Sequence, residues 1–133
     1  MGAHPAIEAF YRACNAHDTA AVEALYATGA LQHEVAQGQT VEGAAAIRGG
    51  LERFLQAFPD ARWDPEPAIL QDGRAAVPYR LTGTLHGALG PFQAEGQKLD
   101  LLGVHVLELD RKGRIRRSSD YWDAATFARQ MRR

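Results

Sequence analysis

The sequence has one cysteine, no charge bias and no long apolar run, and each of these features limits what the protein can be. Because Cys14 is the only cysteine among 133 residues, no disulfide can form within the chain. Fifteen basic residues against sixteen acidic ones give a net charge of -1, so no overall positive field attracts nucleic acid or an anionic membrane. No apolar stretch approaches the roughly 20 residues that span a bilayer, and Met1–His4 lead into a helical pattern without the features of a signal peptide. We therefore expect a cytoplasmic protein with no nucleic-acid or membrane partner.

Motifs for nucleotides and metals are also missing from the sequence. There is no phosphate-binding Gly-x-x-x-x-Gly-Lys-[Ser/Thr] loop and no strand-linked Gly-x-Gly-x-x-Gly. The five histidines show neither His-x-His nor His-Glu-x-x-His spacing, which leaves His33, Glu34 and His105 as the one alternative metal site. Cys14 lies in an apolar helical stripe, where a buried hydrophobe is favoured over a nucleophile that would need a histidine base. We expect no cofactor and no metal.

The apolar pattern changes period along the chain. Ile7, Phe10, Tyr11 and Cys14 follow the i, i+3, i+4, i+7 spacing of a helix, and Asp18 suits the N-cap of a second helix that Gly29 ends. Later segments alternate as strands do, between turn signals rich in glycine and aspartate. The predicted helices are 4–16, 18–29, 43–58 and 124–131, and the predicted strands are 30–36, 62–70, 74–86, 97–110 and 114–121.

Helices followed by consecutive hairpin-linked strands indicate an α+β protein with an antiparallel sheet. No linker, repeat or low-complexity segment divides residues 1–133, so we predict a single domain. Three N-terminal helices packed on one strongly curved sheet, with a short C-terminal helix, would form a cone-shaped α+β barrel that encloses a cavity.

Four stretches, taken together, resemble the nuclear-transport-factor-2-like superfamily, and specifically its SnoaL-like polyketide cyclases and ketosteroid isomerases. The stretches are AFYRACNAHDTAAVEALYATGALQHE, VEGAAAI, LTGTLHG with LGPFQAEGQKL, and GRIRRSSDYWDAATFARQM. Their order and spacing cover nearly the whole chain. The resemblance implies the cone fold, a hydrophobic pocket and a homodimer formed through the open face of the sheet.

The resemblance also implies catalytic residues. Asp123 matches the aspartate that SnoaL-like cyclases use as acid and base, and Tyr121 shares its parity on the last strand. A carboxylate that faces an apolar cavity has a raised pKa and is a stronger base near neutral pH. The alternative is that Asp123 only caps the final helix, because aspartate is a favoured N-cap residue and Ala124 follows directly.

Two further positions are candidates for the same site. His105, on a strand that is apolar on both faces, matches the oxyanion aspartate of ketosteroid isomerase, although histidines on such strands are usually core residues. There it could donate to a developing enolate oxygen. Glu34 falls where the isomerases place their general base, but a shift of one residue would exchange it with His33, because neighbours on a strand point to opposite faces.

Aromatic residues complete the predicted site. Phe10 replaces the oxyanion tyrosine of the isomerases, and Tyr11 lies about 100° away around the helix, so isomerisation of a steroid by that route is disfavoured. The handful of remaining aromatics are either core residues or the walls of a pocket for a flat apolar ligand. The candidate substrate-binding residues are Tyr121, His33, Tyr11, Phe54, Trp63 and Tyr79.

The sequence thus favours a cofactor-independent acid/base enzyme that acts on a hydrophobic cyclic ketone or ester, as a SnoaL-like polyketide (aldol) cyclase. Asp123, His105 and Glu34 are the candidate catalytic residues. The alternatives are an isomerase of the ketosteroid-isomerase type, an epoxide-opening hydrolase in the same pocket, and a non-catalytic module that binds small molecules.

Overall fold

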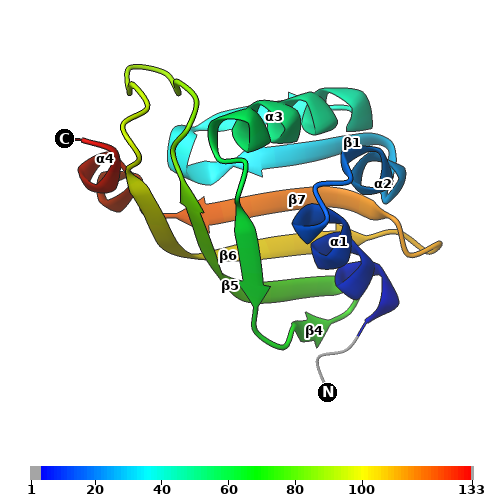
Figure 1. The fold of residues 1–133 in the computed structure, drawn as a ribbon. Coiled ribbons are helices and arrows are strands. Elements are labelled where there is room, and N and C mark those ends of the chain that lie inside the picture. The colour runs from blue at the N-terminus through cyan, green and yellow to red at the C-terminus, as the bar shows by residue number, and fades with distance from the viewer. Residues whose placement is uncertain (1–3, 133) are drawn as a thin grey trace.

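A computed structural model of the protein describes residues 4–132, and it shows helices followed by a curved sheet. Helices α1, α2 and α3 lie on one face of the sheet, and α4 follows the last strand (Figure 1). This arrangement confirms the predicted α+β fold with three N-terminal helices and a short C-terminal helix. The helices are α1 (Pro5–Asn15), α2 (Thr19–Ala24), α3 (Ala44–Ala57) and α4 (Ala124–Met131), with a 3-10 turn η1 (Val35–Gln37).

Side-chain caps begin three of these helices, and two of the capping residues are aspartates, a favoured N-cap type. The His4 imidazole accepts from the Ala6 amide before α1, Asp18 accepts from Ala21 before α2, and Asp123 accepts from Ala125 before α4. The apolar stripe predicted for α1 is buried, including Cys14. Helix α1 is therefore held by packing of one apolar face rather than by propensity alone.

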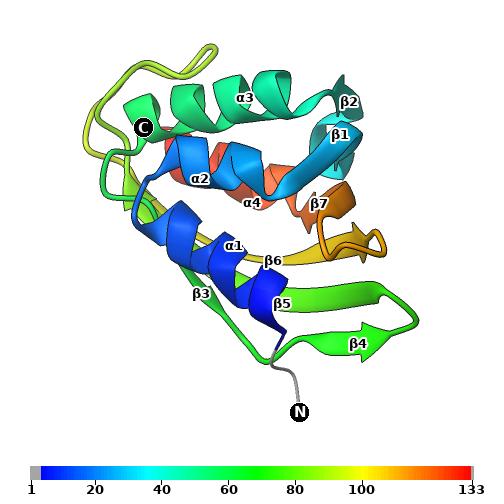
Figure 2. The ribbon, with the colours of Figure 1, turned by 90° about the vertical axis from the view of Figure 1, so that its right-hand side faces the viewer.

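The sheet has seven strands in the order β2-β1-β7-β6-β5-β3, with β4 paired to the far end of β5. Pairing is antiparallel except between the first strand, β1, and the last, β7, which lie side by side and run parallel. Figure 2 shows the sheet bending around the helices, so that its concave face surrounds them. The strands are β1 (Tyr26–Glu34), β2 (Gln39–Glu42), β3 (Arg62–Pro65), β4 (Ile69–Gln71), β5 (Arg74–Thr84), β6 (Lys98–Leu109) and β7 (Ile115–Trp122).

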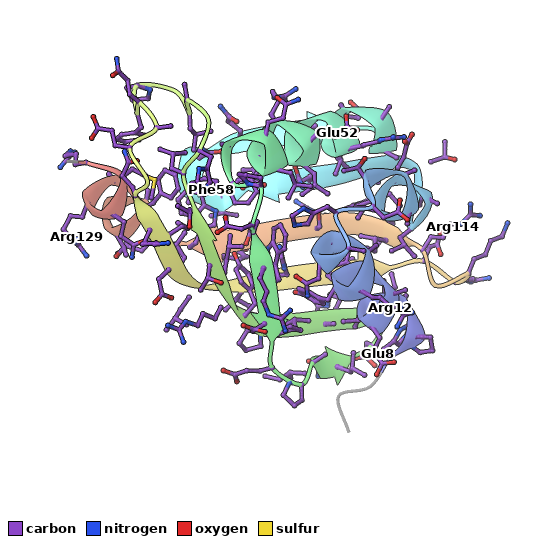
Figure 3. The ribbon with its side chains drawn as sticks, in the orientation of Figure 1. Glu8, Arg12, Glu52, Phe58, Arg114 and Arg129 are labelled. Carbon is purple, nitrogen blue, oxygen red and sulfur yellow. The ribbon has the colours of Figure 1, made fainter. Side chains whose placement is uncertain are left out.

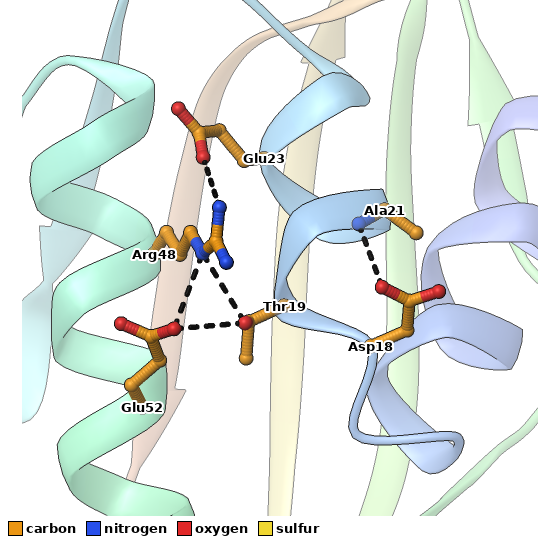
Figure 4. A network of polar contacts seen from close by, with 6 residues as sticks. All are labelled: Asp18, Thr19, Ala21, Glu23, Arg48 and Glu52. Atoms are coloured by element: carbon orange, nitrogen blue, oxygen red, sulfur yellow. Dashed lines mark hydrogen bonds and ion pairs between the residues drawn. The ribbon is translucent and has the colours of Figure 1, made fainter.

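The space between helices and sheet holds the core. Phe58, at the end of α3, is fully buried beneath that helix, whereas Arg114 and Arg129 extend from the periphery (Figure 3). A polar network joins α2 to α3 on the outside: Arg48 contacts Glu23 at 2.9 Å and Glu52 at 3.2 Å, and Thr19 donates to Glu52 (Figure 4). The network fixes the two helices side by side above the sheet.

Two element boundaries differ from the expected ones. Helix α2 ends at Ala24 rather than near Gly29, and Gly29 instead lies inside β1 with a positive φ of 70°. The expected strand 62–70 is divided into β3 and β4, because Pro65 ends β3 and Pro67 follows it, and a proline has no amide hydrogen for strand pairing.

The outer face of β6 is not covered by another element among residues 4–132, contrary to what its apolar residues suggest. Leu102 on this face is 76% exposed, and the neighbouring Tyr121 on β7 is 47% exposed. The homodimer through this face stays a prediction. None of the helices within residues 4–132 is long and apolar enough to cross a membrane.

Candidate active site

A cavity of about 340 Å³ lies between α1, α3 and the concave face of the sheet. Most of its wall is apolar, with Phe10, Val22 and Leu51 from the helices and Leu81 and Leu101 from the sheet. Such a mainly apolar hollow with a few polar groups is the usual form of a small-molecule site. The chemistry of the site therefore depends on which polar side chains face this space.

Three titratable side chains form a row across the cavity wall. His105 on β6 is the register partner of Asp120 on β7, and Asp120 is in turn the partner of Glu34 on β1. All three line the cavity. Because adjacent strands lie about 4.8 Å apart, the sheet itself places an imidazole and two carboxylates side by side.

Asp120 and His105 are held by aromatic neighbours. The Tyr79 hydroxyl donates to Asp120 Oδ1 at 2.6 Å, and His105 Nε2 lies 3.6 Å from the same oxygen. On its other side, His105 Nδ1 shares a hydrogen bond of 2.7 Å with the Tyr11 hydroxyl. The Tyr79 ring stacks on the imidazole and the edge of Phe10 meets it. His105 is thus fixed in position, with one ring nitrogen on Tyr11 and the other toward Asp120.

The two carboxylates have opposite pKa shifts. Burial alone would raise the pKa of Asp120, but the His105 imidazole and the Tyr79 hydroxyl outweigh it and hold that pKa below its ordinary value. Burial and the nearby charge of Asp120 raise the pKa of Glu34 to about 7, although a hydrogen bond from Trp122 and the charge of His105 oppose the rise. Two carboxyl groups whose environments separate their pKa values can divide the roles of ion and proton carrier.

The buried hydroxyl and thiol groups nearby are not ionised near neutral pH. Burial is the main cause that raises the pKa of Tyr11 and of Tyr79, and it raises the pKa of Cys14 to about 12. A thiol with such a pKa is not a nucleophile near neutral pH. Cys14 contributes to the cavity wall as an apolar group.

The structure brings most of the sequence-predicted residues to the cavity. His105, Glu34, Phe54, Trp63 and Tyr79 line it. Tyr11 lies directly behind His105 through the hydrogen bond described above. Because that hydroxyl is engaged by the imidazole, it does not replace the missing oxyanion tyrosine as a donor to substrate.

Asp123, Tyr121 and His33 lie outside this cavity. The Asp123 carboxylate caps α4, where it accepts from the Ala125 amide at 3.1 Å and from Thr126 Oγ1 at 2.7 Å, and these bonds lower its pKa. Asp123 and Tyr121 border a separate open hollow beside Leu102. His33 contacts the guanidinium of Arg117 at 3.3 Å. The geometry of Asp123 is that of the helix cap considered as the alternative.

A β-bulge explains why the even-numbered residues at the end of β7 face inward, rather than the odd-numbered ones that the sequence predicts. Leu109 pairs with Ile115 and Glu108 with Arg117, so β7 has one extra residue at this point. Ile115 is buried on one side of the bulge, and beyond it Ser118, Asp120 and Trp122 face inward. Counting every second residue from Ile115 therefore predicts that Tyr121 and Asp123 face inward. The extra residue at the bulge instead puts Asp120 on the inward face.

Asp120 is the functional candidate that sequence reasoning missed. The run Ser-Ser-Asp-Tyr-Trp-Asp contains two aspartates three residues apart, which alternate faces on a strand. The signal that could have found Asp120 is its register with His105, because His105 precedes the tight turn 110–113 and Asp120 follows it, so the two residues face each other across one hairpin. Among residues 4–132, no three His, Cys, Asp or Glu side chains are grouped so as to hold a metal ion.

Most of the chain matches one known protein family. Residues 7–118 match the sequence profile described as the SnoaL-like domain. The chain belongs to the SnoaL-like domain family. The match includes β1, β5 and β6 and stops in β7, two residues before Asp120. A comparison with curated protein sequences gives no match.

Solved structures show the same fold at low sequence identity. A proposed polyketide cyclase from Xanthomonas campestris pv. campestris is 23% identical, with a TM-score of 0.83 over 96% of this chain and 94% of that one. A proposed SnoaL-like polyketide cyclase from Jannaschia sp. CCS1 is 18% identical, with a TM-score of 0.86 over 95% and 88%. A proposed hydroxylase, AclR, from Streptomyces galilaeus is 19% identical, with a TM-score of 0.80 over 94% and 81%. The SnoaL-like cone fold is thereby confirmed.

Proposed function

We propose that this protein is a SnoaL-like acid/base enzyme that removes a proton next to the carbonyl of a hydrophobic cyclic ketone or ester, as an aldol cyclase does. The observation that carries the proposal is the row of Glu34, Asp120 and His105 across one wall of an apolar cavity. A histidine and two carboxylates with separated pKa values supply a base, an acid and a stabilised ion in one place.

Glu34 is the proton carrier in this proposal. With a pKa of about 7 it is partly ionised near neutral pH, the condition in which a general base is both present and strong enough to act. It takes the proton from the α-carbon, and the electron pair of that C–H bond forms the enolate. When the enolate carbon attacks a second carbonyl of the same substrate, a C–C bond forms, and Glu34 returns its proton to the new alkoxide.

The pair of His105 and Asp120 stabilises the charge that appears on the substrate oxygen. Asp120 stays ionised because its pKa is lowered, and His105 Nε2, 3.6 Å from it, is the ring nitrogen that is not hydrogen-bonded to Tyr11 and can donate to the substrate oxygen. Tyr11 and the Tyr79 ring keep that ring in place. A donor held in position in a mainly apolar cavity stabilises an enolate without reorganisation during the reaction.

The same geometry argues against a purely binding role. A non-catalytic module predicts that Asp123 acts only as a cap and that no titratable groups converge in the cavity. Asp123 is indeed a cap, but Glu34, Asp120 and His105 lie side by side at the cavity on three adjacent strands. The converging row supports catalysis.

The proposal is tested by following α-hydrogen exchange, which needs no knowledge of the natural product. 1-Tetralone, a flat bicyclic ketone, is incubated with the protein in D₂O, and loss of the α-proton signal is measured by NMR. We expect the wild-type protein to accelerate exchange and Glu34→Gln to lose about a hundredfold or more of that rate, the usual contribution of a general base. The control Glu42→Gln changes an exposed carboxylate on β2. Equal rates for both variants would contradict the role of Glu34.

Epoxide opening is a second candidate because it uses the same pair of carboxylates. One carboxylate activates water while a protonated neighbour supplies a proton to the epoxide oxygen, and Glu34 and Asp120 are adjacent with opposite pKa shifts. A proposed hydroxylase among the structures of similar fold is consistent with oxygen chemistry in this cone. Hydrolysis of indene oxide to its diol, lost in Asp120→Asn, would favour this candidate over the cyclase.

A further inference from the structure

Arg53 on α3 borders the cavity, and it is exposed. Its guanidinium folds back along the helix: Nη1 and Nη2 lie 3.6 and 3.8 Å from where Cβ atoms would stand on Gly49 and Gly50. Two glycines therefore leave bare backbone beneath the guanidinium, and Gly50 itself lines the cavity. The cation lies where a ligand in the cavity meets solvent.

Within residues 4–132, Arg53 makes neither an ion pair nor a side-chain hydrogen bond. Arg48, one and a half turns earlier on the same helix, differs completely, because it contacts Glu23, Glu52 and Thr19 (Figure 4). The charges that influence Glu34 are those of Asp120 and His105, not that of Arg53. All five donors of this guanidinium are thus available to a ligand.

Three amide side chains lie at the same cavity. Gln32 is on β1, Gln37 ends η1 and Gln39 begins β2, and all three line the space that Arg53 borders. Gln37 and Gln39 are exposed, as is Arg53. No other described residue is hydrogen-bonded to these three side chains. Gln39 is the register partner of Glu34, so these neutral donors lie beside the carboxylate row, and Arg53 is the only arginine or lysine among the described residues that line the cavity.

We propose that Arg53, assisted by these glutamines, recognises a carboxylate on the substrate, so that the ligand is a flat polycyclic ketone that also bears an acid group. This inference rests on the proposed function and names the substrate class more narrowly. A guanidinium matches a carboxylate with two parallel hydrogen bonds. The negative row repels the acid group and Arg53 attracts it, so the charge pattern orients the ketone toward Glu34 and the acid toward Arg53. Arg53 is a specificity residue rather than a catalytic one.

The test compares two probes of one shape that differ in charge. Anthraquinone-2-carboxylate and its neutral carboxamide are titrated at about pH 6, where the probe acid is ionised and Glu34 is mostly neutral. Binding is followed by quenching of the two tryptophans, Trp63 and Trp122, because both line the cavity. We expect the wild-type protein to bind the carboxylate about fivefold to tenfold more tightly than the carboxamide, as for one charge-assisted contact near solvent.

Variants assign that preference to Arg53. In Arg53→Gln the carboxylate and the carboxamide should bind equally, and in Arg53→Lys part of the preference should remain. The matched control is Arg12→Gln, which removes the same charge from an exposed position on α1 away from the cavity (Figure 3) and should keep the full preference.

The outcomes separate this inference from the proposed function. If both probes bind wild-type protein equally, or if Arg53→Gln keeps the preference for the carboxylate, the role of Arg53 is contradicted while the cavity remains a site for flat ketones. If neither probe binds, the proposed ligand class fails together with this inference. The wild-type ratio requires no variant, so a poorly folded Arg53→Gln protein would not prevent the decision.

Discussion

The Tyr79 hydroxyl reaches Asp120 at 2.6 Å although β5 and β7, which carry the two residues, are not neighbours. Between them lies β6, and Tyr79 crosses it at its register partner Gly103. A Cβ atom on Gly103 would collide with the Tyr79 phenol and with the Tyr121 carbonyl. The absence of a side chain at residue 103 is thus what allows Tyr79 to hold the site aspartate.

We therefore expect Gly103→Ala to displace Tyr79 and to lower the free energy of unfolding by about 1–3 kcal/mol, the usual cost of overpacking. Urea unfolding measures this cost. Gly49→Ala is the matched control, because its added Cβ would meet only the flexible end of Arg53 at 3.6 Å, and a helix interior favours alanine over glycine. A destabilisation of Gly49→Ala equal to that of Gly103→Ala would show that the effect is not specific to the Tyr79 crossing.

Tyr11→Phe should impair the site through His105. The variant removes the partner of His105 Nδ1, so it should cost about 1–3 kcal/mol of stability and leave the imidazole free to change orientation. We expect the rate of 1-tetralone exchange to fall about tenfold or more and its pH dependence to shift. Tyr26→Phe is the control, since it removes a similarly buried hydroxyl bond, to Ser118, that does not touch His105, and it keeps the aromatic ring that lines the cavity. It should lose stability but not exchange rate; parallel losses in both variants would reduce Tyr11 to a structural role.

Glu34 should make the stability of the protein depend on pH. Because its folded-state pKa of about 7 is above the unfolded value of 4.5, the folded state loses stability as pH rises through this range, when a buried carboxylate must ionise beside Asp120. Glu34→Gln removes that cost. We expect the variant to gain roughly 1–3 kcal/mol relative to wild type between pH 5 and pH 8, measured by urea unfolding at both pH values. The exposed Glu42→Gln should show no such gain, and a gain that is the same at both pH values would contradict the raised pKa.

Local patterns were sufficient to predict most of the fold. The spacing of Ile7, Phe10 and Cys14 predicts the buried face of α1, and alternation along β6 predicts that His105 shares a face with Leu101 and Leu107. The resemblance to a family supplied the cavity and drew attention to His105 and Glu34. These features depend on residues close together in the sequence, or on a shared fold.

The remaining part of the site depends on contacts that no local pattern reveals. The bulge between Ile115 and Arg117 decides that Asp120 rather than Asp123 faces inward, and it is defined by pairing with β6. Pairing with Asp120 also places Glu34, and not His33, beside the cavity. The crossing of Tyr79 over Gly103 joins strands that are distant in sequence.

The most direct measurement compares Asp120, which lies on the last strand, β7, with Asp123, which caps helix α4. Asp120→Asn and Asp123→Asn are matched, since each replaces one carboxylate by an amide, and asparagine also serves as an N-cap. We predict that Asp120→Asn lowers the rate of α-hydrogen exchange in 1-tetralone by about a hundredfold or more, because His105 loses its anionic partner, while Asp123→Asn keeps the wild-type rate. The opposite result, loss in Asp123→Asn and retention in Asp120→Asn, would contradict the assignment of the site to the row of Glu34, Asp120 and His105.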